Sequence, residues 1–498
     1  MKKIIVGLLT AVLFGSLLAG CGSQEAATEP ETTQTQQEAE QPAEEPAAQP
    51  EQSEEVVTLK WVSVGSGMPA NYDAWAENLN AYLEEKIGVH VEMEIIGWGD
   101  WDARRNLIVS TNEPYDIMFT NNGTFYNDVS INAFADISDL VGTAAPGLVD
   151  FIPEDYWNAC RIDGKLYAVP TYKDSSSTQY FVWDKALVEE HFPEYENAHT
   201  MQDLTAGLKA VYDATGEAVF ILNQMGMDAI YASKYDDISS GLPAVGVSYA
   251  NGEPKVVSVF EQEDVLADLK TLNEWYEAGY VNSDAAILAE APTYRPCFVA
   301  QGWSYAAVTT WGPQMGVDAV AVQYGDTVLS NSTVQGSMNC ISASCQYPEK
   351  ALQLLELVNT DSYVRDALYF GLEGDDFEYT ADGKVNRLKT DWTMAGYTQG
   401  TFFNVSQQTT EEVNQWDEVR ALNENATGSP ILGFSFNTEP VQDELAACIA
   451  IFTSYRPVLM TGTEDPVTTV EAMMAEMREA GFDTIMQEIQ TQIDAWNS

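Results

Sequence analysis

The spacing of apolar residues between positions 58 and 120 alternates between the period of a strand and the period of a helix. Two stretches have apolar side chains at helical spacing, and shorter strand-like runs precede, separate and follow them. This β-α-β-α-β order predicts a parallel sheet whose faces are covered by helices. The expected strands are 58–64, 89–95 and 115–120, and the expected helices lie between Asn71 and Gly88 and over 101–111.

The loops that follow these strands are the first candidates for a binding site. Ligands of parallel α/β sheets bind beyond the carboxyl ends of the strands, which here are residues 63–67, 97–100 and 121–126. The last two loops combine aromatic rings with carboxylate and amide side chains. We therefore expect them to line a cleft.

The later part of the chain continues the alternation of helices and strands. Helical spacing predicts helices over 201–214 and 265–278, and a strand over 218–222 lies between them. Pro348 suits the first position of another helix, because its missing N–H is not needed there. The roughly 440 residues after position 56 exceed what one hydrophobic core usually supports, so two lobes are expected.

The stretch from Ile162 to Trp183 is the expected connection between the two lobes. An Asp-Gly turn and a short strand end at Pro170, which cannot donate to a central strand ladder. The polar run 173–178 follows, and a second strand begins at Gln179. Because the run is so polar, we expect it to lie outside either core, where the chain crosses from one body to the other.

The N-terminus has the pattern of an exported lipoprotein. Lys2 and Lys3 precede an apolar run, 4–18, that is too short for an ordinary spanning helix and is typical of a secretory signal. Leu-Ala-Gly-Cys then ends at Cys21 and looks like a bacterial lipobox, whose cysteine is lipidated. An uncleaved anchor is the alternative. Residues 22–56 are rich in Gln, Glu, Ala, Pro and Thr, and we expect a disordered acidic tether.

Charge and cysteine content exclude several classes of function. The formal net charge of −53 would repel nucleic acid and anionic bilayer surfaces, so neither is expected as a partner. Five cysteines follow Cys21 without C-x-x-C spacing, and the chain has three histidines, so neither a zinc site nor any other metal site or cofactor is predicted. Buried free thiols are expected, although Cys340 and Cys345 are close enough in sequence to pair.

Known catalytic motifs are absent from the sequence. It contains no G-x-S-x-G, no phosphate-binding P-loop and no H-E-x-x-H, and the Gly-Ser-Gly at 65–67 lacks the third glycine of a dinucleotide-binding loop. A glycan-degrading enzyme would need two carboxylates flanking one bond, and a sequence alone cannot place such a pair. We therefore expect a binding protein rather than an enzyme.

Five passages carry a resemblance to known proteins: IDGKLYAVP at 162–170, NEWYEAGYVNSDAA at 273–286, the segment 337–374, GFSFNTEPVQDELA at 433–446 and AGFDTIMQEIQTQIDAW at 480–496. Together they resemble the extracellular solute-binding protein family 1, the substrate-binding lipoproteins of ABC importers. The last two resemble a DUF3502-like domain present in one subgroup of that family.

The resemblance implies a two-lobed α/β fold of the periplasmic-binding-protein type (type II) with hinge crossings between the lobes. Lobe I is expected to comprise 57–172 and 338–374, and lobe II 173–337 and 375–498, which includes the C-terminal domain. The signal peptide is expected to be 1–21.

The implied function is capture of a small solute by hinge closure and its delivery to an ABC permease. A carbohydrate is the solute most consistent with the resemblance, and the protein is expected to be a monomer anchored by lipid (palmitate) on the extracytoplasmic face of the cell membrane. The alternatives are a binding protein for another solute, such as a peptide, and an extracellular glycan-degrading enzyme.

The predicted solute-contacting residues combine flat rings with hydrogen-bonding groups, because the C–H faces of sugars stack on aromatic planes while their hydroxyls need polar partners. Each ring has a plain alternative as a core residue. Trp311 is included from its order along the chain relative to a stacking tryptophan in sugar-binding relatives, and Trp303 could take that place. Phe434 and Phe436 are weaker candidates. The predicted set is Trp98, Asp100, Asn121, Asn122, Phe125, Tyr126, Tyr172, Asp174 and Trp311.

Overall fold

The computed structural model describes residues 56–238 and 241–498. The predicted signal segment, the lipobox with Cys21 and all but the last residue of the predicted tether lie outside the described residues. Within them, the chain forms two lobes, each built on its own sheet and hydrophobic core. Lobe I here means the segments packed on the first sheet, and lobe II those packed on the second.

The sheet of lobe I has the strand order β2-β1-β3-β13-β6. The first three strands are parallel, as the alternating pattern predicts, and β13 runs antiparallel to both of its neighbours. The strands are β1 (Val57–Gly65), β2 (Val89–Gly97), β3 (Ile117–Thr120), β13 (Met338–Ile341) and β6 (Val169–Pro170).

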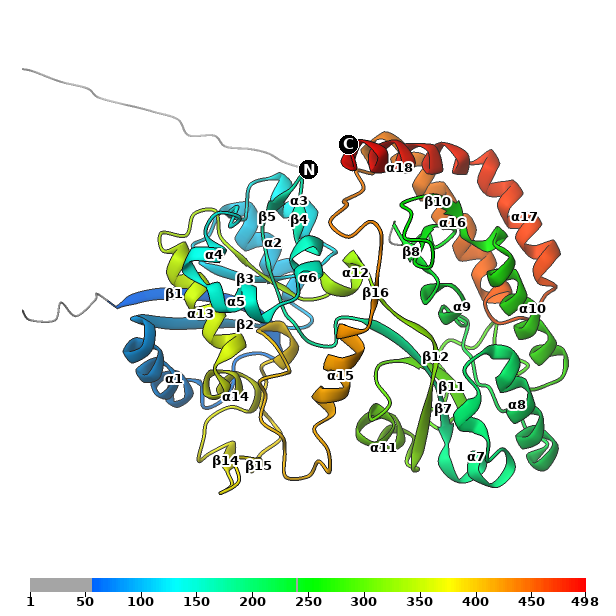
Figure 1. The fold of residues 1–498 in the computed structure, drawn as a ribbon, viewed down its shortest axis with the longest axis horizontal. Helices are drawn as coiled ribbons and strands as arrows, with labels where there is room; N and C mark the ends of the chain where they lie inside the picture. Colours follow the sequence, from blue (N-terminus) through cyan, green and yellow to red (C-terminus); the bar gives the residue numbers. More distant parts are fainter. Residues whose placement is uncertain (1–55, 239–240) are drawn as a thin grey trace, which may run out of the picture. The chain divides into compact units, whose positions relative to one another are not determined.

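Helices on both faces of this sheet complete the core of lobe I (Figure 1). A two-stranded hairpin, β4 (Arg161–Ile162) with β5 (Lys165–Leu166), closes the turn at Asp163. The helices are α1 (Tyr72–Ile87), α2 (Trp101–Thr111), α3 (Phe125–Ser130), α4 (Val141–Ala144), α5 (Pro146–Phe151), α6 (Glu154–Ala159), α13 (Pro348–Thr360) and α14 (Ser362–Phe370).

Lobe II contains a mixed sheet in the order β11-β7-β12-β16 and a three-stranded sheet in the order β10-β9-β8. In the mixed sheet β7 lies between β11 and β12 and is antiparallel to both, and its side chains are buried throughout. The strands are β7 (Ser177–Asp184), β11 (Cys297–Gln301), β12 (Ala319–Leu329), β16 (Thr427–Gly428), β8 (Tyr235–Asp237), β9 (Val245–Ser248) and β10 (Val256–Ser258).

The C-terminal helices belong to the core of lobe II. Ile485, Ile489 and Ile493 repeat at helical spacing along α18 and are completely buried. The helices of lobe II are α7 (Lys185–His191), α8 (Met201–Thr215), α9 (Ala229–Ala232), α10 (Glu263–Glu277), α11 (Gly312–Met315), α16 (Gln442–Leu459), α17 (Pro466–Glu479) and α18 (Phe482–Trp496). The predicted strand over 218–222 is not a continuous strand. Phe220 pairs through isolated bridges with Val281 and Cys297.

The expectation that the polar run 173–178 lies outside a core is wrong, because Ser175, Ser177 and Thr178 are buried. Burial is tolerated because long-range partners satisfy the polar groups. The hydroxyl of Thr178 lies 2.8 Å from that of Thr327 on β12. Asn423 accepts a hydrogen bond from the Ser176 amide at 3.0 Å and donates one to the Lys173 carbonyl.

The division after residue 374 also differs from the predicted one. Residues 377–411, which include β14 (Phe377–Tyr379) and β15 (Val385–Arg387), pack largely with lobe I rather than lobe II. Met394 bridges to Gly65 at the end of β1, and the hydroxyls of Ser63 and Thr398 are 2.9 Å apart. The cause is a shared apolar cluster, in which Phe370 of α14 contacts residues from this segment.

Over the described residues, the chain therefore passes between the lobes three times. The first crossing joins β6 to β7, and the second joins β12 to β13 through the short helix α12 (Asn331–Val334). The third runs through α15 (Gln415–Glu424) into β16, which pairs with β12. Asn423 on α15 makes the bonds to the first crossing described above, so the first and third crossings are tied together.

All five cysteines in the described part of the chain are free, including Cys340 and Cys345, and only Cys345 is more than slightly exposed. Within residues 56–238 and 241–498, no three His, Cys, Asp or Glu side chains are grouped so that they could hold a metal ion. In the same described ranges, no helix has the length and apolar character needed to cross a membrane.

Candidate functional site

The carboxyl ends of the parallel strands meet the hinge crossings at one edge of the lobe I sheet. Thr120, the last residue of β3, pairs with Met338, and Met338 also pairs with Pro170. The first crossing leaves the sheet after Pro170, and the second enters it at Met338. Residues after β3 are therefore held next to the segments about which the lobes can move.

A cavity of about 430 Å³ lies at this edge and takes residues from both lobes. This volume falls in the range of small-molecule sites, roughly 300–1,000 Å³. Lobe I contributes Asn122 and Tyr126, the second crossing contributes α12 and its flank, and lobe II contributes the remainder. The lining residues are Asn122, Tyr126, Asp236, Asp237, Ile238, Asn331, Ser332, Gln335, Ile431, Phe434, Ser435, Phe436, Thr438 and Leu445.

The lobe I wall is built by the tight connection from β3 into α3. The Asn121 side-chain oxygen accepts the Gly123 amide at 3.0 Å, and the Asn122 amide donates to the Gln335 carbonyl at 2.9 Å. Phe125 and Tyr126 then begin α3. Successive residues of a helix point about 100° apart. Consequently Phe125 is 1% exposed in the core, whereas Tyr126 is 40% exposed and lines the cavity.

A buried ion pair fixes α3 and hence the position of Tyr126. Arg105 on α2 pairs with Asp128 on α3, and both side chains are almost fully buried. Burial raises the pKa of the Asp128 carboxyl, and the neighbouring Arg105 guanidinium opposes that rise. Removal of either partner would leave an uncompensated buried charge, which is strongly destabilising.

The lobe II wall combines two phenylalanines with two carboxylates. Phe434 is nearly buried and meets Trp496 of α18 edge-on, with ring centroids 5.9 Å apart, while Phe436 is only half-buried. Asp236 on β8 is 4% exposed, and burial raises its pKa to about 7, although the Ser429 hydroxyl opposes the rise. Among the described residues, its Oδ2 has no hydrogen-bond partner.

Among the described residues that line this cavity, none is lysine or arginine. The groups that can contact a ligand are two carboxylates, amides, hydroxyls and aromatic rings. An anionic group in the cavity would face Asp236 and Asp237 with no cation at hand in the lining. A neutral molecule with several hydroxyl groups fits this lining better than an anion does.

Trp98 and Asp174 do not line this cavity. Trp98 follows β2 and is 52% exposed, and its ring is stacked over Tyr397 at 6.2 Å with an interplanar angle of 12°. The Lys173 ammonium lies 5.7 Å from the centre of the Tyr397 ring and 2.7 Å from the Asp174 carboxylate. Asp100 is exposed at the start of α2.

Tyr172 and Trp311 are core residues in this conformation. Tyr172 is 4% exposed and packs edge-on against Tyr156 and Phe403, with centroids 4.9 and 4.7 Å away. Trp311 is 8% exposed and packs 6.2 Å from Tyr180 in a small cluster of lobe II. Together with Phe125, these two predicted residues offer little surface to a solute. Of the nine predicted residues, Asn122 and Tyr126 line the cavity.

Asp236, Asp237 and the residues of α12 were not among the predicted site residues. The two aspartates lie on a three-residue strand that has no alternating pattern long enough to be noticed. Asn331 and Gln335 lie in a segment of small polar residues that reads as an ordinary loop. For the lobe II wall, the sequence signal was the Gly-Phe-Ser-Phe passage at 433–436. A Phe-x-Phe spacing in an extended segment puts both rings on one side.

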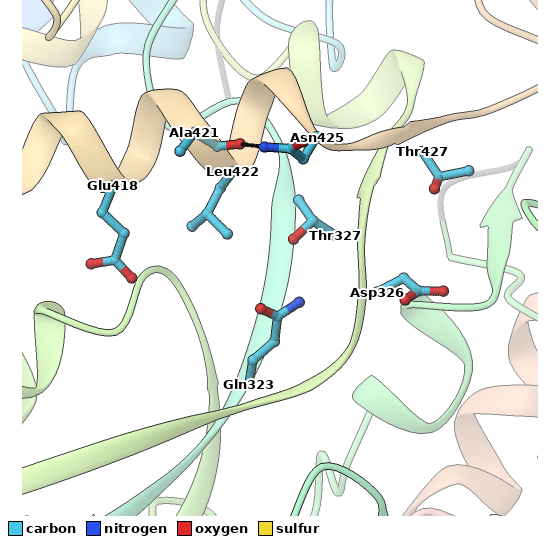
Figure 2. Close-up of a pocket in the computed structure, with 8 residues that line it drawn as sticks. All are labelled: Gln323, Asp326, Thr327, Glu418, Ala421, Leu422, Asn425 and Thr427. Carbon is cyan, nitrogen blue, oxygen red and sulfur yellow. Dashed lines mark hydrogen bonds between the residues drawn. The ribbon is translucent and has the colours of Figure 1, made fainter. Parts of the chain in front are cut away.

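A second cavity, of about 450 Å³, lies between α15 and β12 (Figure 2). Its lining is mainly polar, with Gln323 and Asp326 on β12 and Glu418 on α15. Glu418 is already engaged, because it accepts the amides of Ser304 and Tyr305 at 2.7 and 3.1 Å. No aromatic ring lines this cavity. The cavity between the two lobes is therefore the better candidate for a solute site.

Two known families match the chain. Residues 77–370, more than half of its length, match the family described as bacterial extracellular solute-binding protein. The chain belongs to this family. Residues 430–498 match DUF3502, a domain of unknown function. Both matches confirm the resemblance found in the sequence. Membership of the extracellular solute-binding family places the protein outside the cytoplasm and among binding proteins rather than enzymes.

Relatives of this solute-binding protein come from several bacteria. A carbohydrate ABC transporter substrate-binding protein of Streptococcus pneumoniae serotype 4 is 27% identical over 465 residues, which cover 88% of this chain and 90% of the relative. Among solved structures, the N-glycan transport solute binding protein NgtS of S. pneumoniae has a TM-score of 0.78 at 24% identity, covering 88% of this chain and 99% of that chain.

Two further solved structures share the fold. NgtS in complex with Man5GlcNAc has a TM-score of 0.63 at 24% identity and covers 88% of this chain and 98% of that chain. An HMO-binding solute-binding protein of Bifidobacterium longum infantis has a TM-score of 0.59 at 14% identity, with coverage of 88% and 98%. These likenesses confirm the predicted two-lobed fold of solute-binding proteins.

Proposed function

We propose that this solute-binding protein captures a neutral oligosaccharide in the cavity between its lobes and delivers it to an ABC permease. The observation that carries the proposal is the lining of the cavity. Tyr126 from lobe I and Phe436 from lobe II supply ring faces, and Asn122, Asp236 and Ser332 are among the groups that can bond hydroxyls. The absence of lysine and arginine from the lining disfavours uronic, sulfated and sialylated sugars.

The placement of the cavity supports hinge closure as the mechanism. A solute that contacts both Tyr126 and Phe436 binds both lobes at once, so it favours the arrangement in which these two walls lie close together. Three crossings can absorb the movement. The relatives support the choice of solute, because their names include a carbohydrate transporter component and an N-glycan transport protein.

Anchoring is part of the same proposal. Cys21 at the end of the lipobox carries the lipid, and the acidic segment after it holds the binding domain away from the membrane. A tether of this composition lets the two lobes reach a permease in the same membrane while they sample solutes outside it. The protein acts as a monomer that has one site between its lobes.

A thermal-shift screen tests the proposal. Neutral oligosaccharides, their uronic-acid counterparts and a set of short peptides are added to the purified protein without its signal segment. A ligand that binds only the folded state at 100 times its dissociation constant stabilises it by about 2.7 kcal/mol, so its melting temperature rises. We expect shifts with neutral saccharides alone. Shifts with peptides and none with saccharides would assign the cavity to another class of solute.

A further inference from the structure

One segment of the C-terminal domain, residues 431–438, precedes its long helices and lines the cavity. Ile431, Phe434, Ser435, Phe436 and Thr438 all line it. At its far end the segment is held by α18, because Gln492 both donates to the Asn437 carbonyl and accepts the Asn437 amide, each at 2.9 Å.

At its near end the segment is held by one side chain of the hinge. Asn331, in the short helix α12 of the second crossing, donates to the carbonyls of Ile431 and Phe434, both at 2.9 Å. Its side-chain oxygen accepts the Gly433 amide at 2.8 Å. One amide thus fixes the backbone on both sides of Gly433, and the direction in which the two phenylalanines leave the segment follows from it.

The other end of α12 is bound to lobe I. The Gln335 carbonyl accepts the Asn122 amide at 2.9 Å, and the Gln335 side chain donates to the Ala159 carbonyl at 2.7 Å. A single helical turn therefore connects the wall that carries Tyr126 with the wall that carries Phe436. A change in the angle between the lobes must move both walls through this turn or break these bonds.

Gly433 allows the segment to lie against lobe I. Its φ of +87° is in the region that favours glycine, and a Cβ there would lie 2.8 Å from the Asn158 carbonyl of α6. The neighbouring Leu432 packs against the core of lobe I. The segment is therefore in contact with both lobes, although its helices belong to lobe II.

We propose that the C-terminal domain has a binding role: segment 431–438 is the lobe II wall of the saccharide site, with Phe436 as the stacking ring and Asn331 as the residue that positions the wall and links it to the hinge. The saccharide class rests on the function proposed above. The link between the two walls through α12 rests on the hydrogen bonds alone, so it can be tested without a ligand.

Two variants of the full chain and a matched control test the wall. The probe is Man5GlcNAc, titrated by calorimetry. Phe436→Ala is expected to weaken binding about tenfold, the loss of one stacked ring with its buried area. Asn331→Ala is expected to weaken it several-fold. Asn282 is the control, because it also bonds a backbone on both sides, with the Leu222 amide and carbonyl at 2.8 and 3.0 Å, but does not line the cavity.

Amide hydrogen exchange provides a second readout that needs no solute. Asn331→Ala is expected to speed exchange at Gly433 in lobe II and at Asn122 in lobe I, whereas Asn282→Ala changes neither. Faster exchange at Gly433 with Asn122 unchanged would overturn the link through α12. Weakened binding in Tyr126→Ala with unchanged binding in Phe436→Ala would contradict the assignment of segment 431–438 as the lobe II wall, but not the proposed function. A wild type that binds no saccharide would overturn the proposed function and the wall, and the exchange result would still decide the link.

Discussion

The Asp236 carboxyl should make the stability of lobe II depend on pH. Asp236 is 4% exposed, and burial raises its pKa to about 7. In the unfolded chain an aspartate has a pKa of about 3.9. The protonated form is therefore favoured in the folded state, so the stabilisation is complete below about pH 4 and is lost as the pH rises toward 7.

The magnitude follows from the difference between these values. Between pH 5 and pH 8 the free energy of unfolding falls over about two pH units, because from pH 5 to about pH 7 Asp236 is protonated in the folded state but ionised in the unfolded state. At 1.36 kcal/mol per unit, the loss is about 3 kcal/mol. Asp236→Asn removes the titration and keeps the shape, so its stability relative to wild type should increase by about that amount between pH 5 and pH 8.

Urea unfolding of wild type and variant at both pH values, followed by circular dichroism, provides the measurement. Asp326→Asn, which removes an exposed carboxylate of the same lobe, controls for the change in net charge. Asp237 on the same strand and Tyr249 are the other titratable groups that interact with Asp236 in the described chain. A difference in the free energy of unfolding between variant and wild type that is the same at both pH values would show that the Asp236 carboxyl does not titrate in this range.

Three further changes have expected outcomes. Phe125→Ala should lower the free energy of unfolding by about 3–5 kcal/mol because it empties a core site, as a denaturant titration would reveal, and a loss below 1 kcal/mol would contradict the core assignment. Asn423→Ala should cost about 1–3 kcal/mol in the same titration, because it leaves buried groups of the first crossing unpaired, and an unchanged midpoint would contradict this. Cys21→Ser should release the protein from membranes or leave it unprocessed, and lipid labelling of that variant would contradict the lipobox assignment.

Local patterns were enough to predict the first half of lobe I. Strands and helices from Val57 to Thr120 were expected within a few residues of their observed bounds, because their apolar spacing is regular and each connection is short. The burial of Phe125 and the exposure of Tyr126 could not be predicted, because they depend on where α3 begins. A shift of one residue would exchange the buried ring and the exposed ring.

Long-range packing explains most of what the sequence did not indicate. Thr178 and Thr327 are far apart in the chain, as are Ser176 and Asn423, so nothing local indicates that a polar crossing is buried. In the same way, the attachment of Met394 to Gly65 depends on how an irregular segment folds back onto lobe I. Apolar spacing indicates helices and strands, whereas such long-range pairings form only when these elements pack together.

A saccharide bound between Tyr126 of lobe I and segment 431–438 of the C-terminal domain can be detected by calorimetry. The titration compares wild type, Tyr126→Ala and Trp98→Ala, with the saccharide that gives the largest thermal shift. We expect about tenfold weaker binding for Tyr126→Ala, whose ring lines the cavity, and a smaller change for Trp98→Ala, whose exposed ring stacks outside it. Unchanged affinity in Tyr126→Ala, together with a large loss in Trp98→Ala, would contradict this binding site and place the solute on the Trp98–Tyr397 surface.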